Sequence, residues 1–370
     1  MKQIRLLGLM VVFACTLTAG NKAKIQAVPE QVMQKIYEEV KTPYKYGLIM
    51  VPADDSKKID CPSVFRKNNK WFMTYLVFDG RGYETWLAES SDLLHWESKG
   101  RILSFSSDTS RWDCHQKAGY IALQDTKWGG SYQLHTYDNK YRMSYIGGGS
   151  TGYEAGTLSI GIAYTEKDPA NVHEWNSSDL PVLTATDKNV RWWENRKLYK
   201  STIIRDKAKT TGYPFVMYYN ANGDSARNNI KTRWYERIGM AVSNNLVDWK
   251  RMPEEPLVHH PKGITGDPVI QKIGDVWVMF YYGAFWEGRT DAFNRFACSY
   301  DLVNWTDWNG DDLISPSEDF DRQYAHKPFV IKYDNVVYHF YCAVDEKGNR
   351  GIALATSKDI GKSKLHFNTN

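Results

Sequence analysis

Short stretches in which aromatic and aliphatic residues alternate recur along the chain. The clearest occupy residues 71–76, 141–146, 215–219, 276–281 and 337–341. Stretches of this composition, bounded by turn residues, are typical of β-strands. A second strand pattern precedes each one, at residues 62–66, 118–123, 201–205, 268–272 and 328–332. The pattern therefore predicts pairs of antiparallel strands, repeated five times.

A short motif closes each repeat. The sequence Ser-Asp-Leu-Leu-His-Trp at 91–96 recurs in related form at 243–249 and 299–305, a looser copy ends at Trp175, and a fifth without its Trp occupies 357–360. Each copy follows a third predicted strand, at 84–89, 159–164, 237–242, 295–298 and 351–356. One such sheet cannot bury both faces, whereas five packed radially can. We therefore expect an all-β fold, a five-bladed β-propeller, over residues 45–370. A β-sandwich would not repeat its closing motif five times, and the units are too long for a β-helix.

The N-terminal region has a different character. Residues 1–20 resemble an export signal, with Lys2 and Arg5 before an apolar run at 6–17 that is too short to span a bilayer. Cleavage near Gly20 and lipidation of Cys15 are both open, so the protein is expected in the periplasm or anchored to a membrane as a lipoprotein. No other segment is long and apolar enough to be transmembrane. Residues 21–44 form an extension in which 29–41 has the spacing of an amphipathic helix. That helix is expected to pack on the propeller rim or, in a homodimer, on a partner chain.

Composition excludes some classes of function. The net charge is only +4, and no run of Lys and Arg provides a nucleic-acid footprint. The 14 Trp, 24 Tyr and 14 Phe suit both pleated sheets and sugar-stacking platforms. Four cysteines follow the export signal, and their spacing matches no metal site, so no metal or cofactor is expected. Cys61 and Cys114 are the candidate pair for a disulfide in an oxidising compartment.

Aligning the five first strands brings ionisable residues to one end of the propeller axis. Taking Pro62 as reference, the preceding residues are Cys61, Lys117, Lys200, Asp267 and Lys327, and the residues before those are Asp60, Gln116, Tyr199, Gly266 and His326. Buried charge is costly unless it is paired or used. The alignment therefore predicts an axial functional site that contains Asp60, Asp267, His326 and the three lysines.

The same residues carry a family resemblance. Asp60-Cys61-Pro62-Ser63-Val64, Gly266-Asp267-Pro268 and the Ser-x-Asp-Leu-x-x-Trp ends resemble the five-bladed glycoside hydrolases of families 43, 32 and 117, over about residues 45–360. Family 43 would place a Glu and an Asp where this chain has Asp267 and Lys200. Family 117 has an Asp in blade one, an Asp in blade four and a His acid in blade five, which Asp60, Asp267 and His326 match. The resemblance implies an exo-acting, inverting glycoside hydrolase with an oligosaccharide substrate.

Inversion assigns a role to each of these residues. It needs a base and an acid about 6.5–9.5 Å apart, on opposite faces of the sugar. The resemblance makes Asp60 the base and His326 the acid. Asp267 is then expected to keep His326 protonated or to orient the sugar. Glu194, in the loop before the third blade, is the competing acid.

Further residues are candidates for substrate binding. Asp113, His115 and Gln116 precede the first strand of blade two and could bind sugar hydroxyls, while Trp192, Trp193 and Trp286 are candidate stacking platforms. Lys117, Lys200 and Lys327 share one repeat position, and three like charges round a channel favour an anion. This predicts an acidic or sulfated sugar, unless each Lys pairs with a nearby carboxylate. Two other functions stay open: a glycoside phosphorylase that uses inorganic phosphate, and a non-catalytic carbohydrate-binding propeller.

Overall fold

The computed structural model describes residues 27–54, 56–223 and 235–368. Within these ranges it contains one α-helix, α1 (Glu30–Val40), twenty β-strands and a short 3-10 helix, η1 (Asp319–Asp321). None of the helices in these ranges has the length and apolarity needed to cross a membrane. The export signal expected at residues 1–20, including Cys15, lies outside the described residues.

The strands form five antiparallel groups of four. The first group is a separate sheet of β2 (Lys58–Lys67), β3 (Lys70–Phe78), β4 (Tyr83–Ser90) and β5 (Glu97–Leu103). The second group is also a separate sheet, of β6 (Gln116–Ile121), β7 (Tyr141–Gly148), β8 (Ser159–Thr165) and β9 (Asn176–Ser177). The third group is β10 (Lys197–Arg205), β11 (Phe215–Asn222), β12 (Glu236–Ser243) and β13 (Trp249–Met252). The fourth group is β14 (Ile264–Ile273), β15 (Val276–Ala284), β16 (Ala292–Ser299) and β17 (Thr306–Asp307). The last group is β18 (Tyr324–Tyr333), β19 (Val336–Val344), β20 (Arg350–Thr356) and β1 (Tyr44–Met50). The predicted strands of all five repeats are thereby confirmed.

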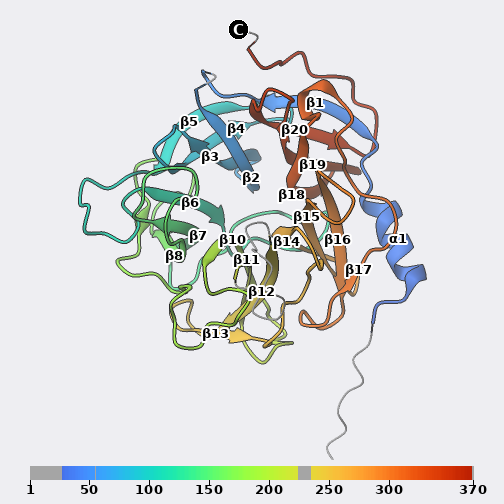
Figure 1. Cartoon of the computed structure of the whole chain (residues 1–370). Coiled ribbons are helices and arrows are strands. Elements are labelled where there is room, and N and C mark those ends of the chain that lie inside the picture. Colours follow the sequence, from blue (N-terminus) through green and yellow to red (C-terminus); the bar gives the residue numbers. More distant parts are fainter. Residues whose placement is uncertain (1–26, 55, 224–234, 369–370) are drawn as a thin grey trace, which may run out of the picture.

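These groups are arranged like the blades of a propeller. In Figure 1 the first strands β2, β6, β10, β14 and β18 lie nearest the middle of the molecule, and the later strands of each group lie farther out. Single parallel pairings, Glu236 with Ile264 and Ala292 with Tyr324, join the third, fourth and last groups into one 12-stranded sheet. The side chains that meet near the middle therefore come from all parts of the sequence.

The recurring closing motif is a turn between the third and fourth strands. The hydroxyl of Ser243 accepts hydrogen bonds from the backbone N–H groups of Asn245 (3.1 Å) and Leu246 (2.9 Å). The indole of Trp249 donates to the carbonyl of Leu246 at 3.2 Å. The same contacts recur at Ser299, Leu302 and Trp305, and at Ser90, Leu93 and Trp96. The first copy thus uses Ser90 rather than Ser91, and the motif serves folding rather than chemistry.

Helix α1 packs on the rim of its own chain. Met33, Ile36 and Val40 are buried, and Tyr37 stacks on Trp308 with ring centroids 5.2 Å apart. The helix was expected to pack on the propeller rim or on a partner chain, and its described contacts are with the rim.

The last strand group contains both the first and the last strand of the described chain. β1 pairs antiparallel with β20, from Tyr44 opposite Thr356 to Met50 opposite Ile352. Beyond β20 the chain turns back over β1, where the N–H of Ser363 donates to the carbonyl of Tyr46 at 2.7 Å. The N-terminal strand therefore completes a sheet begun by the C-terminal strands.

Candidate active site

A cavity of about 330 Å³ lies where the first strands converge. This volume falls at the lower end of the range for small-molecule sites. The residues that line it come from all five strand groups and include Lys58, Cys61, Tyr83, Tyr120, Tyr153, Glu154, Tyr199, Lys200, Asn220, Glu236, Asp267, Tyr282, Tyr324, His326, Lys327 and Arg350. Ionisable and tyrosine side chains thus dominate its wall.

Irregular pairing between strands directs several of these side chains toward the cavity. The register between first and second strands shifts after Asp60, Leu198, Gly266 and His326. A β-bulge of this kind re-aims a side chain out of the regular alternation. Cys61, Asp267 and Lys327 have positive φ angles of 50°, 55° and 57°. Backbone of this kind is strained for residues other than glycine and is often found at functional sites.

Asp60 is bound to two cations. It is 1% exposed, and its Oδ2 lies 2.7 Å from Lys327 Nζ and 2.8 Å from an Arg350 guanidinium nitrogen. Burial alone would raise the pKa of Asp60, but the charges of Lys327 and Arg350 outweigh burial and hold it well below its usual range. Asp60 is ionised, and it lies behind the two cations, which themselves line the cavity.

His326 is a neutral imidazole. Burial, together with the neighbouring charge of Lys327, lowers the pKa of His326 to about 3. Its Nδ1 lies 3.1 Å from the carbonyl oxygen of Cys342, so Nδ1 carries the proton and donates. The remaining nitrogen, Nε2, is then an acceptor. The expectation that Asp267 keeps His326 protonated is therefore wrong for the free protein.

Asp267 instead faces Cys61 and Lys200. Its Oδ2 lies 3.6 Å from the Cys61 sulfur and 3.9 Å from Lys200 Nζ. Burial raises the pKa of Asp267 against the opposing charges of Lys200 and Lys327. All four described cysteines are free, so the disulfide considered for Cys61 and Cys114 is not formed. The Cys114 sulfur faces the carbonyl of Thr109 instead, at 3.8 Å.

Two cavity carboxyls, Glu236 and Glu154, were missed by the alignment of first strands. Glu236 begins β12 and accepts a hydrogen bond of 2.6 Å from the Asn220 amide. Desolvation in the cavity raises the pKa of Glu236 to about 8, and the negative charges of Glu154 and Asp267 add to this. Glu154 lies between β7 and β8 with φ of 49°, and desolvation raises its pKa, opposed by Lys327 and Arg350.

A sequence pattern was available for some of the missed residues. Tyr83, Glu236, Ala292 and Arg350 each begin the third strand of their group, and all four line the cavity. An alignment of third strands as well as first strands would have found Glu236 and Arg350. Glu154 lies in the loop between β7 and β8, outside the strands that such an alignment compares.

Gln116 organises the loop that carries Glu154. Its side-chain amide donates to the carbonyls of Ser150 (3.0 Å) and Gly152 (2.7 Å), and its oxygen accepts from the N–H of Tyr83 at 3.1 Å. Gln116, predicted to bind sugar, is 0% exposed and does not line the cavity. It positions residues that do.

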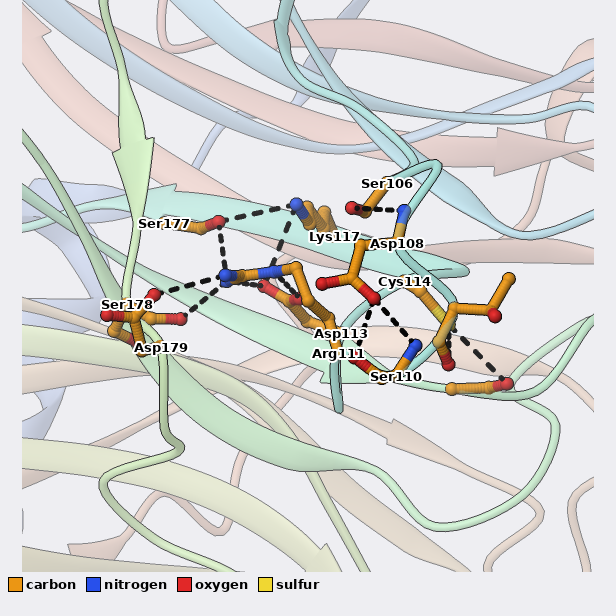
Figure 2. A network of polar contacts seen from close by, with 12 residues as sticks. Ser106, Asp108, Ser110, Arg111, Asp113, Cys114, Lys117, Ser177, Ser178 and Asp179 are labelled. Atoms are coloured by element: carbon orange, nitrogen blue, oxygen red, sulfur yellow. Dashed lines mark hydrogen bonds and ion pairs between the residues drawn. The ribbon is translucent and has the colours of Figure 1, made fainter.

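Asp113 and Lys117 belong to a separate polar network, which Figure 2 shows. Asp113 accepts hydrogen bonds from Arg111 at 2.9 Å and from the Tyr145 hydroxyl at 2.8 Å. Lys117 Nζ lies 3.7 Å from Asp113 and donates to Ser177 at 3.3 Å. The pairing of β6 with β7 has no register shift, so Lys117 is not turned toward the cavity as Lys200 and Lys327 are. Its predicted place in the axial pocket is therefore wrong.

Glu194 occupies the equivalent network in the third group. It is 0% exposed, accepts a hydrogen bond from the Tyr219 hydroxyl, and lies 3.0 Å from Arg251. In the last group Asp321 contacts Tyr341 and Lys45 in the same manner. A second-strand tyrosine, a buried carboxylate and a cation thus form a repeated structural unit. This removes Glu194 from the cavity and explains why its sequence position resembled that of a catalytic acid.

The remaining predicted residues also lie outside the cavity lining. Trp193 is 1% exposed in the core, and its indole donates to the carbonyl of Glu254 at 3.1 Å. Trp286 stacks on His260 with centroids 4.3 Å apart, and Trp192 lies under the guanidinium of Arg237 at 5.0 Å. His115 is half-buried beside Gln116. The aromatic rings in the cavity are mainly tyrosines. No group of three or more His, Cys, Asp or Glu able to hold a metal ion occurs within the described ranges.

Comparison with known proteins gives a clear family. No protein-family profile and no curated protein matches the chain. Two solved structures, one described as a complex of BT0996 with RGII and the other as a glycoside hydrolase, are 53% and 52% identical to it; for each the TM-score is 0.89, and the match covers 92% of this chain and 99% of theirs. A thermostable family-43 glycoside hydrolase (15% identity, TM-score 0.57, covering 87% of this chain and 99% of that one) shares the fold. With half of its residues identical over nearly the whole of the first two structures, the chain belongs to the glycoside hydrolases of propeller-like fold.

Proposed function

We propose that the chain is an exo-acting glycoside hydrolase, a five-bladed β-propeller whose axial cavity receives the terminal sugar of an oligosaccharide. The five four-stranded groups support this blade count. A cavity enclosed by residues from all five groups suits the end of a sugar chain better than its middle. One relative is described in complex with RGII, and we propose that RGII is also the source of the substrate of this chain.

The observation that carries the mechanism is that two carboxyls, Glu236 and Glu154, line one cavity and have different charged neighbours. With a pKa of about 8, Glu236 keeps its proton at neutral pH, as a general acid must. Desolvation raises the pKa of Glu154 as well, but Lys327 and Arg350 oppose that rise. A difference in surroundings between two cavity carboxyls is what distinguishes an acid from its partner. We assign Glu236 as the acid that protonates the leaving oxygen, and Glu154 as the base or nucleophile.

A second assignment uses the residues predicted from sequence. The assignment of Asp60 as base and His326 as acid stays a prediction. The ionised state of Asp60 favours the role of base for that residue. A neutral His326 whose one ring proton is directed at a backbone carbonyl is a poor proton donor, however. We therefore place His326 as an acceptor for a sugar hydroxyl, and Asp60 as the residue that positions Lys327 and Arg350.

Hydrolysis fits the cavity better than phosphorolysis. A phosphate dianion needs several cations without carboxylate neighbours, but Lys327 and Arg350 share Asp60, Lys200 lies 3.9 Å from Asp267, and Lys117 lies outside the lining. Turnover that depends on inorganic phosphate would contradict this choice. Inversion stays a prediction, and proton NMR of the anomer first released tests it.

Substitution of the two carboxyls tests the assignment. Glu236→Gln should lower turnover of an RGII-derived oligosaccharide by at least about a hundredfold, while an aryl glycoside with an activated leaving group is spared. Glu154→Gln should slow both substrates. Glu194→Gln is the matched control, since it removes a buried carboxyl outside the cavity and should leave the ratio of the two rates unchanged. If His326→Gln alone shows the leaving-group pattern, the assignment of Glu236 is wrong.

Export and assembly remain proposals of the same kind. A periplasmic or lipid-anchored location would bring the enzyme to extracellular oligosaccharides, and mass spectrometry of the mature N-terminus distinguishes cleavage near Gly20 from lipidation of Cys15. A homodimer through α1 would have to use the face of the helix that the rim leaves exposed. Light scattering of the purified protein tests that assembly.

A further inference from the structure

One ammonium group in the cavity has no hydrogen-bond partner. Lys200 is 1% exposed and lines the cavity, yet its Nζ makes no hydrogen bond within the described part of the chain. Its nearest carboxylate oxygen, Oδ2 of Asp267, is 3.9 Å away. The ring of Tyr120 lies 5.4 Å from the same nitrogen. Buried charged groups left without hydrogen bonds are rare, and in a cavity a bound ligand can supply the missing partner.

The distance between Lys200 and Asp267 has a specific chemical meaning. At 3.9 Å the two groups are too far apart for a direct hydrogen bond, whose length is about 2.7–3.2 Å. One oxygen atom between them can contact both at hydrogen-bond distance. A hydroxyl accepts from the ammonium and donates to the carboxylate, so it satisfies both groups at once.

The surroundings favour a hydroxyl over an anion. An anionic substituent at Lys200 would also meet the Asp267 carboxylate. The cations that could offset that repulsion, Lys327 and Arg350, already bind Asp60. Of the three lysines from which an anionic substrate was expected, only Lys200 remains both in the cavity and without a bonded carboxylate.

We propose that Lys200 and Asp267 together bind one hydroxyl group of a neutral terminal sugar, and that this contact selects the substrate. This inference rests on the proposed function, since it identifies the class of sugar that the same cavity takes. It replaces the expectation of an acidic or sulfated sugar by a neutral one.

Activity measurements test the pair. The variants are Lys200→Met, Asp267→Asn and, as matched control, Lys117→Met, which removes a buried lysine at the same repeat position outside the cavity. Loss of a hydrogen bond to a charged group should lower kcat/KM on an RGII-derived oligosaccharide at least about tenfold in the first two variants. The melting temperature of Lys200→Met is measured beside its activity, because the variant also removes the positive charge 3.9 Å from Asp267. A drop in stability with kcat/KM retained would overturn the proposal, and so would an equal loss of kcat/KM in Lys117→Met.

A binding experiment separates this inference from the proposed function. Common neutral pentoses and hexoses and the corresponding uronic acids are added to wild type and to each variant, and binding is followed by saturation-transfer NMR. A neutral sugar should bind wild type and Lys117→Met, bind Lys200→Met at least about tenfold more weakly, and be insensitive to salt. That result upholds the inference even if wild type does not cleave the oligosaccharide. Binding of uronic acids alone, or of none of the sugars, overturns it even if cleavage is observed.

Discussion

Asp60 and Lys327, 2.7 Å apart, join the first strand group to the last. Arg350 adds a second cation at 2.8 Å, so two positive side chains of the cavity wall share one buried carboxylate. Removing one member of a buried ion pair leaves the other charge uncompensated, which typically costs more than the intact pair contributes.

The first prediction concerns stability at this ion pair. Asp60→Asn should lower the free energy of unfolding by about 3 kcal/mol or more, because Lys327 and Arg350 lose their shared anion. Chemical denaturation at pH 7 measures the change. Since Asp60 has a pKa held below its ordinary value of about 3.9, its stabilisation is present above that pH and decreases as the pH falls further. The difference in free energy of unfolding between wild type and Asp60→Asn should therefore become smaller as the pH is lowered. Unchanged stability with lost turnover would point instead to Asp60 as the base.

The second prediction concerns the pH dependence of catalysis. If Glu236 is the acid, kcat/KM should decrease as the pH rises through about 8, because the free enzyme loses the catalytic proton there. A profile on an oligosaccharide and one on an activated aryl glycoside should differ, since the second needs little protonation. An equal decrease in kcat/KM at high pH on both substrates would contradict the role of Glu236.

A third prediction follows from the same carboxyl in the folding equilibrium. A carboxyl whose folded pKa is raised binds more protons when folded, so its effect on stability worsens as the pH rises from about 4.3 to about 8. Glu236→Gln removes this cost and should be more stable than wild type at pH 8, with the advantage disappearing near pH 4. Thermal melts across that range provide the measurement. A variant less stable at pH 8 would show that Glu236 contributes to folding through its hydrogen bond with Asn220.

The fourth prediction concerns Tyr153, which precedes Glu154 in the chain. Its side chain lines the cavity while remaining 44% exposed, and its hydroxyl accepts from Arg350 at 3.2 Å. The rings of Phe78 and Tyr83 hold the Tyr153 ring from one side, with centroids 5.4 and 5.7 Å away. We predict that this exposed ring stacks on the leaving sugar.

Two variants of Tyr153 separate ring from hydroxyl. Tyr153→Phe keeps the ring and should change KM for the oligosaccharide less than about threefold, whereas Tyr153→Ala should raise it by about two- to tenfold, the size of an aromatic contact. KM for a small aryl glycoside serves as the internal reference. Equal effects of the two variants would assign the role to the contact with Arg350.

The sequence predicted the strands well because each repeat carries its own turn residues and its own alternation. It placed Lys200, Asp267, His326 and Lys327 correctly in the cavity, since their strands share the same bulge. Lys117 has the same position in sequence but not the bulge, and the direction of a side chain depends on that pairing detail. Asp113 and Glu194 were misassigned because acidic residues before a first strand bond to a tyrosine of the second strand, which only the folded structure reveals.

The pairing of β1 with β20 has a consequence for how the protein is made. Tyr44 and Thr356 pair although they lie 312 positions apart in the sequence. At a synthesis rate of about 5–20 residues per second, β1 emerges about 15–60 s before its partner exists. During that interval residues 44–50, of which the last five are buried in the finished protein, lack their native partner strand, and an unpaired segment of this kind pairs readily with other chains. The yield of native enzyme should therefore depend on how well the cell protects residues 44–50 until the final strand arrives.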